Sequence, residues 1–260
     1  YLLRKKQCKI GLVTSTSAHL ILAALNRLEL TSSFDVIICG DMGLLWAKYR
    51  EFAYNQKWLS ALPFTILWVQ GNHENYDMIA EYPVCAWHGG KARHIVEDKI
   101  ILLERGQVFE LEGKSFFTFG GASSHDVQGG ILDRSSPTYE KERRQANKRG
   151  LPYRVRGVSW WEQELPSAEE MQEGRDNLSR HGYVVDYVIT HCLSGRMQGR
   201  LDVVRSVSKG GDSARDILTD YFDEIEEKLK YEHWFCGHYH ENIRLDEKHT
   251  VIYEDILALQ

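Results

Sequence analysis

The stretch Phe64-Thr65-Ile66-Leu67-Trp68-Val69-Gln70-Gly71-Asn72-His73-Glu74-Asn75 joins an apolar run to a polar end. Its first six residues have the branched and aromatic composition of a buried strand. Gly71 ends the run, and Asn72 and His73 follow at once. An amide oxygen and an imidazole nitrogen are donors that bind divalent cations. The stretch therefore predicts a buried strand with metal-binding chemistry at its carboxyl end.

Four other segments also place polar, metal-binding side chains at the end of an apolar run. They are Cys39-Gly40-Asp41, Gly120-Gly121-Ala122-Ser123-Ser124-His125-Asp126, Thr190-His191 and Gly237-His238-Tyr239-His240. Each segment alone is more readily explained by a turn or by exposed polar side chains. Side chains beyond the carboxyl ends of neighbouring strands, however, meet in one crevice of an α/β sheet. The ordered set Asp, Asn-His, His and His-x-His therefore predicts a shared oxygen and nitrogen site for divalent metal.

The spacing of apolar residues predicts a single domain, residues 1–260, built of two halves rich in strands and helices. Strands are expected at 9–13, 34–39, 64–69, 100–103, 107–111, 115–119, 184–190, 233–236, 243–245 and 251–253. Helices are expected at 19–30, 45–62 and about 212–230.

An insertion at about 127–181 interrupts this alternation. It contains a basic run from Lys141 to Arg156 and ends in a helix opened by the capping box Ser167-Ala168-Glu169-Glu170. The basic run is either a solvated charged face or a cap whose Arg side chains meet a substrate phosphate. Trp160-Trp161 either forms a pocket wall or anchors the insertion on the core.

The composition is that of a globular domain with no marked affinity for polyanions. The apolar and charged fractions are 43% and 27%, and the net charge of -5 does not favour nucleic acid or an anionic membrane. No apolar run approaches the roughly 18 residues of a transmembrane helix. The five scattered Cys form no CxxC pair, and Cys39, Cys192 and Cys236, which lie in or just after apolar runs, are expected to be small buried thiols. With no visible signal peptide, the cytoplasm is the expected location.

The ordered motifs resemble the calcineurin-like metallophosphoesterase superfamily over nearly the whole chain. The stretch 64–75, together with Tyr82-Pro83-Val84, Trp87-His88-Gly89-Gly90-Lys91 and Ser159-Trp160-Trp161, is similar to an uncharacterised bacterial single-domain branch of it. The resemblance implies an α/β fold, a four-layer αββα sandwich with a cap-like insertion. It also implies a phosphoesterase that uses one or two metal ions. Mn²⁺ is favoured, and Fe²⁺/Fe³⁺, Zn²⁺ and Ni²⁺ are the alternatives.

The resemblance also implies a role for each motif residue. Asp41 bridges two metal positions, and Asn72, His191 and His238 complete the first. His240 belongs to the second position. His73 is the catalytic residue, which protonates the leaving alkoxide or orients the phosphate. His125 and Asp126 are candidate substrate-binding or metal-supporting residues, with a plain turn as the alternative.

The N-terminal segment departs from the family pattern. The first strand should end in Asp-x-His, but the chain has no carboxylate between Tyr1 and Glu29. The missing pair falls on Ser15 and Ser17, or on Thr16 and Ala18, and His19 is a possible substitute for one ligand. The second metal position is therefore expected to bind weakly, with reduced activity.

Two functions follow from the sequence. The first is a metal-dependent phosphoesterase that hydrolyses phosphomono- or phosphodiester bonds of a small molecule or nucleotide. Its support is the set of ligands retained. The second is a catalytically weak or inactive binding or regulatory module on the same scaffold, supported by the Thr14–Ser17 loop. Nucleic acid is a possible partner that the net charge does not support.

Overall fold

The computed structural model describes residues 12–14, 36–45, 49–62, 64–205 and 215–259. The helix expected at 19–30 and the N-terminal loop that contains Ser15 to His19 lie outside these ranges.

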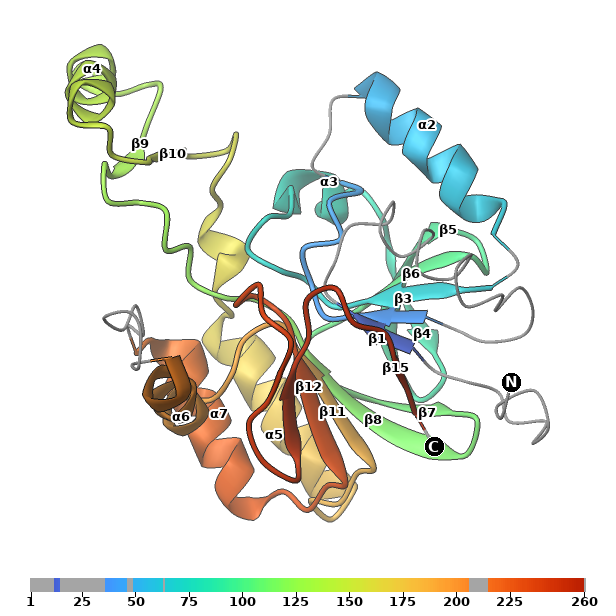
Figure 1. Cartoon of the computed structure of the whole chain (residues 1–260). Coiled ribbons are helices and arrows are strands. Elements are labelled where there is room, and N and C mark those ends of the chain that lie inside the picture. The colour runs from blue at the N-terminus through green and yellow to red at the C-terminus, as the bar shows by residue number, and fades with distance from the viewer. Residues whose placement is uncertain (1–11, 15–35, 46–48, 63, 206–214, 260) are drawn as a thin grey trace.

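The first sheet has the strand order β15-β1-β2-β3-β6-β5-β4 (Figure 1). Strands β1, β2, β3 and β6 run parallel, whereas β15, β5 and β4 run antiparallel to their neighbours. The buried parallel strands β2, β3 and β6 are almost wholly apolar, as expected for strands covered on both faces. The bounds are β1 Leu12–Thr14, β2 Val36–Ile38, β3 Ile66–Trp68, β4 Val84–Trp87, β5 Gly90–Val96, β6 Ile100–Leu103 and β15 Leu257–Ala258.

The second sheet has the order β13-β14-β12-β11-β8-β7. Its central strands β8, β11, β12 and β14 are parallel, and β7 and β13 pair antiparallel at the two edges. The bounds are β7 Gln107–Leu111, β8 Lys114–Phe119, β11 Tyr187–Thr190, β12 His233–Cys236, β13 Ile243–Arg244 and β14 His249–Val251.

The two sheets pack face to face, with helices on both outer faces (Figure 1). Successive residues of β3 show the alternation: Leu67 belongs to the core between the sheets, and Trp68 packs outward with Leu59 of helix α2 (Tyr49–Ser60) and Ile79 of α3 (Tyr76–Ala80). The outer face of the second sheet packs on α5 (Ala168–Arg180) and α7 (Ile217–Lys228). The predicted four-layer αββα sandwich is confirmed.

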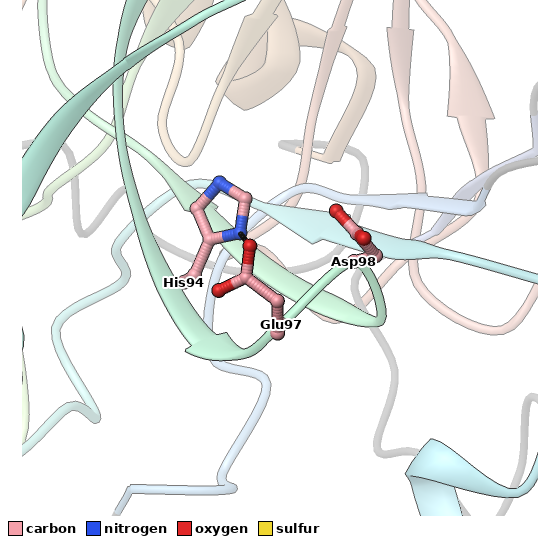
Figure 2. Close-up of side chains that lie close together, drawn as sticks. All are labelled: His94, Glu97 and Asp98. Carbon is pink, nitrogen blue, oxygen red and sulfur yellow. Dashed lines mark ion pairs between the residues drawn. The ribbon is translucent and has the colours of Figure 1, made fainter.

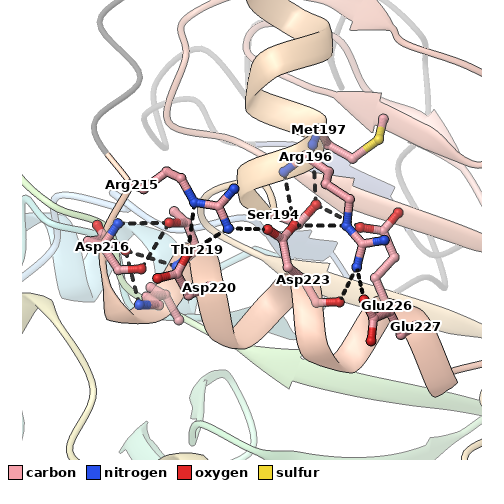
Figure 3. Close-up of polar contacts among 11 residues, drawn as sticks. Ser194, Arg196, Met197, Arg215, Asp216, Thr219, Asp220, Asp223, Glu226 and Glu227 are labelled. Atoms are coloured by element: carbon pink, nitrogen blue, oxygen red, sulfur yellow. Dashed lines mark hydrogen bonds and ion pairs between the residues drawn. The ribbon is translucent and has the colours of Figure 1, made fainter.

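Helix α6 (Gly195–Arg205) lies beside α7, and polar contacts join the two (Figure 3). The carboxylate of Asp223 accepts a hydrogen bond from the Arg196 backbone at 2.9 Å and pairs with the Arg215 guanidinium at 2.6 Å. Asp216 caps α7 by accepting from the Thr219 backbone at 2.8 Å. These contacts fix the helices that cover the second sheet.

The insertion forms an arm that projects from the sandwich and then returns to it (Figure 1). Strands β9 (Ile131–Leu132) and β10 (Arg154–Val155) pair in parallel, and helix α4 (Tyr139–Arg149) connects them. Only Ala146 of α4 is buried, so the helical part of the basic run is a solvated face. The buried indole of Trp161 donates to Asp77 at 2.9 Å and anchors the returning chain. Helix α5 then joins the outer layer of the sandwich.

Most predicted strands are present, with shifts of a few residues at their ends. The capping box of Ser167 and Glu170 is confirmed. The last predicted strand, 251–253, instead forms at His249–Val251. The sequence prediction missed the hairpin β4–β5, helices α3, α4 and α6, the short strands β9, β10 and β15, and the 3-10 turn η2 (Glu162–Glu164). None of the described helices is long and apolar enough to cross a membrane.

Candidate metal centre

Four predicted ligands meet at the carboxyl ends of four strands, two from each sheet. Asp41 and Asn72 follow β2 and β3, and His191 and His238 follow β11 and β12. Asn72 Oδ1 lies 3.1 Å from His191 Nε2 and 3.1 Å from His238 Nδ1. Asp41 Oδ2 lies 3.3 Å from His191 Nε2. The predicted convergence of these donors is therefore present.

The hydrogen bonds around this cluster direct lone pairs toward its centre. His191 Nδ1 lies 2.6 Å from the Cys39 carbonyl oxygen, which can only accept, so Nδ1 carries a hydrogen. In the neutral ring, Nε2 then presents a lone pair to Asp41 and Asn72. The Asn72 amide nitrogen donates to Ser124 Oγ at 3.2 Å, which keeps Oδ1 toward the imidazoles. With His191 neutral, acceptors from three residues therefore face one another, and a cation between them would remove the repulsion.

The surroundings shift the pKa values of three residues in this cluster. Burial alone raises the pKa of Asp41, but His191 and His73 outweigh it and hold that pKa well below the ordinary range. Burial keeps the pKa of His238 well below its usual value, so this imidazole is neutral. His191 is the reverse: burial lowers its pKa, but the Asp41 carboxylate raises it above the usual value. A proton on His191 Nε2 and a divalent cation would both be stabilised by these acceptors, and the mixed oxygen and nitrogen donors fit a divalent metal.

Two glycines allow the strand ends to approach this closely. A Cβ on Gly40, whose φ is +88°, would lie 2.2 Å from His191 Nδ1. A Cβ on Gly71 would lie 2.0 Å from Asp41 Oδ1. Any side chain at either position would displace a predicted ligand. The glycines before Asp41 and Asn72 are thus required by the packing of the cluster as well as by the turns.

His73 lies between the cluster and the insertion. Its backbone N–H donates to Asp41 Oδ1 at 2.8 Å, while its ring nitrogens Nε2 and Nδ1 lie 2.8 and 3.2 Å from Arg154 Nη2. Burial and then the Arg154 charge lower the pKa of His73, although the Asp41 carboxylate opposes this. Because a guanidinium can only donate, the His73 nitrogen that faces Arg154 Nη2 is an acceptor.

The remaining predicted site residues lie around the cluster. The exposed His125 ring is 5.3 Å from the His238 ring, between centroids. Asp126 forms an ion pair with Arg154 at 2.7 Å. His240 is exposed, and its ring packs on Tyr253 with centroids 4.8 Å apart. His240 therefore makes no direct contact with the four donors in the hydrogen bonds described, and its role as a ligand remains a prediction.

Two buried acids near the cluster were not predicted. Glu164 Oε2 accepts from Ser124 Oγ at 2.7 Å, so Glu164, Ser124 and Asn72 form one chain of hydrogen bonds. Glu164 is 2% exposed, and burial raises its pKa to about 7. Glu74 is fully buried behind Asp41, where burial raises its pKa well above the usual value. A charged residue in a polar segment gives no sequence signal that it will be buried.

Another group of possible ligands comprises His94 near the end of β5 and Glu97 and Asp98 in the turn that follows (Figure 2). Its ligand atoms all lie within 4.8 Å of one another. The turn precedes β6 and is therefore at the opposite end of the parallel strands from Asn72. Glu97 is 82% exposed, so water competes with any ion there. In the cluster at the strand ends, by contrast, Asn72 and His191 are fully buried, so water competes less there.

The two-sheet αββα fold and the donors at its strand ends define an α/β protein with a candidate metal centre. A family model described as calcineurin-like phosphoesterase matches residues 16–242, and the chain belongs to this family, whose members use divalent metal ions. A comparison with curated proteins found no match. A solved structure described as phosphopantetheinyl hydrolase (PptH) from Mycobacterium tuberculosis is similar at 12% identity, covering 94% of this chain and 90% of that one. The TM-score of this pair is 0.40.

Proposed function

We propose that this protein is a metal-dependent phosphoesterase that hydrolyses phosphomono- or phosphodiester bonds. The observation that carries the proposal is the set of acceptor atoms from Asp41, Asn72 and His191 that face one another, with His238 beside them. These four residues would hold a divalent cation, for which Mn²⁺ suits the mixed donors. When bound, the cation supplies the Lewis acidity that activates a water for attack on phosphorus.

Residues of the chain prepare the site for this reaction. The Cys39 carbonyl fixes the tautomer of His191, and Ser124 fixes the orientation of the Asn72 amide. His73 is held over Asp41 by its own backbone N–H. From this position its ring orients a phosphate oxygen or transfers a proton to the leaving alkoxide.

The second metal position has an incomplete set of ligands, so we expect a reduced rate of hydrolysis. His240 and the shared Asp41 are the ligands proposed for it, and the expected Asp-x-His is absent from the sequence. A lone cation lowers the pKa of water less than a pair does. The same absence is the specific feature that favours the second candidate, a binding or regulatory module with little or no catalysis.

Metal content and hydrolysis measured on the same preparation separate the two candidates. The purified protein is loaded with Mn²⁺, its metal stoichiometry is determined, and a generic aryl phosphodiester and monoester are offered. We expect about one tightly held ion per chain and slow hydrolysis that rises with added Mn²⁺ and with pH. Bound metal without hydrolysis of either ester would favour the binding module, and no bound metal would refute both the centre and the mechanism.

A further inference from the structure

Arg154 is the residue through which the insertion reaches the metal centre. Its side chain is 4% exposed, although the other Arg and Lys residues of the basic run are on the surface. Nε donates to Asp126 Oδ1 at 2.7 Å, and Nη1 donates to the Ser159 carbonyl oxygen at 2.7 Å. Nη2 donates to His73 Nε2 at 2.8 Å. Three edges of the guanidinium are thus directed to three different segments.

The backbone of Arg154 is fixed as well as its side chain. Arg154 lies in β10, where it pairs with Ile131 of β9, and its N–H donates to the Gly130 carbonyl oxygen at 3.2 Å. The next residue, Val155, is buried, and its carbonyl oxygen accepts a hydrogen bond from the Ser159 backbone N–H in a tight turn. A small sheet and a turn therefore hold the guanidinium in one place, which lowers the entropic cost of using it in binding.

The charges around Arg154 suit an anionic ligand. Its guanidinium is permanently charged, and Asp126 is a half-exposed partner at 41%. The carboxylates of Asp41 and Asp126 both act on His73, and Glu164 interacts with Arg154. A divalent cation on Asp41 would reverse the sign of the charge there. A bound cation would add a positive charge to that of Arg154 near His73, and a phosphoryl group would be attracted to both.

We infer that Arg154 is a substrate-binding residue, and that Nη2 exchanges its bond to His73 for a bond to a phosphoryl oxygen. Nε and Nη1 keep their bonds to Asp126 and Ser159 during this exchange. The guanidinium is held by Nε and Nη1, and Nη2 can change its acceptor. Such a group is a suitable donor to a phosphate oxygen, since Arg binds phosphate through planar N–H groups. The inference rests on the proposed function for its ligand class, a phosphate ester.

This inference gives Asp126 a different role from the one predicted from the sequence. Asp126 anchors the guanidinium, because its Oδ1 accepts a hydrogen bond from Arg154 Nε. His73, freed from Arg154 when the phosphoryl group binds, can act on the leaving group. One displacement thus couples substrate binding to the release of the catalytic imidazole.

Binding of inorganic phosphate tests the inference without requiring turnover. Calorimetry of the Mn²⁺-loaded protein is compared for wild type, Arg154→Met, Arg154→Lys and the control Arg156→Met. Arg156 is two residues away in the same arm, but its exposed side chain stacks on Trp160. We expect Arg154→Met to weaken phosphate binding about 10–100-fold, the usual loss for a charge-assisted hydrogen bond. Arg154→Lys should fall between it and wild type, and Arg156→Met should stay within about twofold.

Combination with His73→Ala distinguishes contact from positioning. If Arg154 binds phosphate itself, Arg154→Met still weakens phosphate binding in the His73→Ala background, by at least the same factor, because no bond to His73 has to be given up there. An effect that disappears in that background would overturn the inference, because Arg154 would then act only through His73. Unchanged phosphate binding in Arg154→Met, with metal content and circular dichroism also unchanged, would overturn it too. If Arg154→Met does not fold, Arg154→Lys decides, and phosphate binding as tight as in wild type would overturn the inference.

The failure of this inference is separable from the failure of the proposed function. A wild-type protein that binds metal and phosphate but hydrolyses no ester refutes the phosphoesterase, and the Arg154 comparison still stands or falls on phosphate affinity. An active wild type whose phosphate affinity is insensitive to Arg154 refutes the inference alone.

Discussion

Replacement of His238 tests the metal centre most sharply, because the chain provides a matched control two residues away. His238 contacts Asn72 within the four-donor cluster, whereas His240 is exposed and packs on Tyr253. Both substitutions by Ala remove one imidazole from the same loop. Only the first removes a donor of the proposed first metal position.

The expected effect follows from ligand linkage. An ion at a hundredfold excess over its Kd stabilises the folded protein by about 2.7 kcal/mol. For a chain of 260 residues, this corresponds to a rise in Tm of roughly 5 °C. Loss of one ligand should weaken binding by at least about 100-fold, the upper value for residues that only support a ligand. At the same Mn²⁺ concentration the stabilisation then falls to about 0.4 kcal/mol, less than 1 °C.

Scanning calorimetry with and without Mn²⁺ measures this shift directly. We expect a rise of about 5 °C for wild type and nearly as much for His240→Ala, but less than about 1 °C for His238→Ala. Any effect of either substitution on the metal-free protein cancels, because each variant is compared with itself. A full shift in His238→Ala, or a shift lost equally in both variants, would refute the assignment of the four donors.

Three further predictions concern catalysis, pH and the second metal position. His73→Ala should keep fold and metal but lower turnover by roughly 10²–10⁴-fold, and a series of leaving groups should show a smaller loss for better ones; an equal loss across the series would indicate positioning instead. Burial raises the pKa of Glu164 from 4.5 to about 7, so its contribution to stability is fully present below pH 4.5 and is lost as pH rises through 7. Glu164→Gln should therefore raise the free energy of unfolding in urea at pH 8, by at most about 3 kcal/mol, and not at pH 4. Equal effects at the two pH values would contradict this prediction. Asp and His introduced at Ser15 and Ser17, or at Thr16 and Ala18, should raise both bound metal and rate, and a wild type already holding two tight ions would show the prediction to be wrong.

The donors at the strand ends were predictable because two simple signals coincide there. Apolar runs such as Phe64–Val69 mark parallel strands covered on both faces, and parallel strands bring their carboxyl ends together. The four donors from Asp41 to His238 therefore converge although they are far apart in the sequence. The αββα architecture came from the resemblance, and the alternation of Leu67 and Trp68 between two cores gives its physical basis.

The contribution of the insertion was not predictable in the same way. Arg154 and His73 are 81 positions apart, and Arg154 stands in a run whose other basic residues are on the surface. Helix α4 has one buried residue, so the apolar spacing that reveals a packed helix is missing. Hairpin β4–β5 was missed for a related reason, since most of β4 is exposed. Burial of a charged residue depends on partners that the local sequence does not specify.

The equal division of the four donors between the two sheets has a consequence for the order of events during synthesis. Asp41 and Asn72 leave the ribosome well before His191 and His238, and two isolated oxygen donors hold an ion weakly. The first sheet must therefore fold up to β6 without help from the metal, and the ion can be captured only after β12 has docked beside β11. Metal binding should thus be a late step in folding, which occurs only once the two sheets have packed together. A chain that ends before residue 238 should therefore bind no metal tightly.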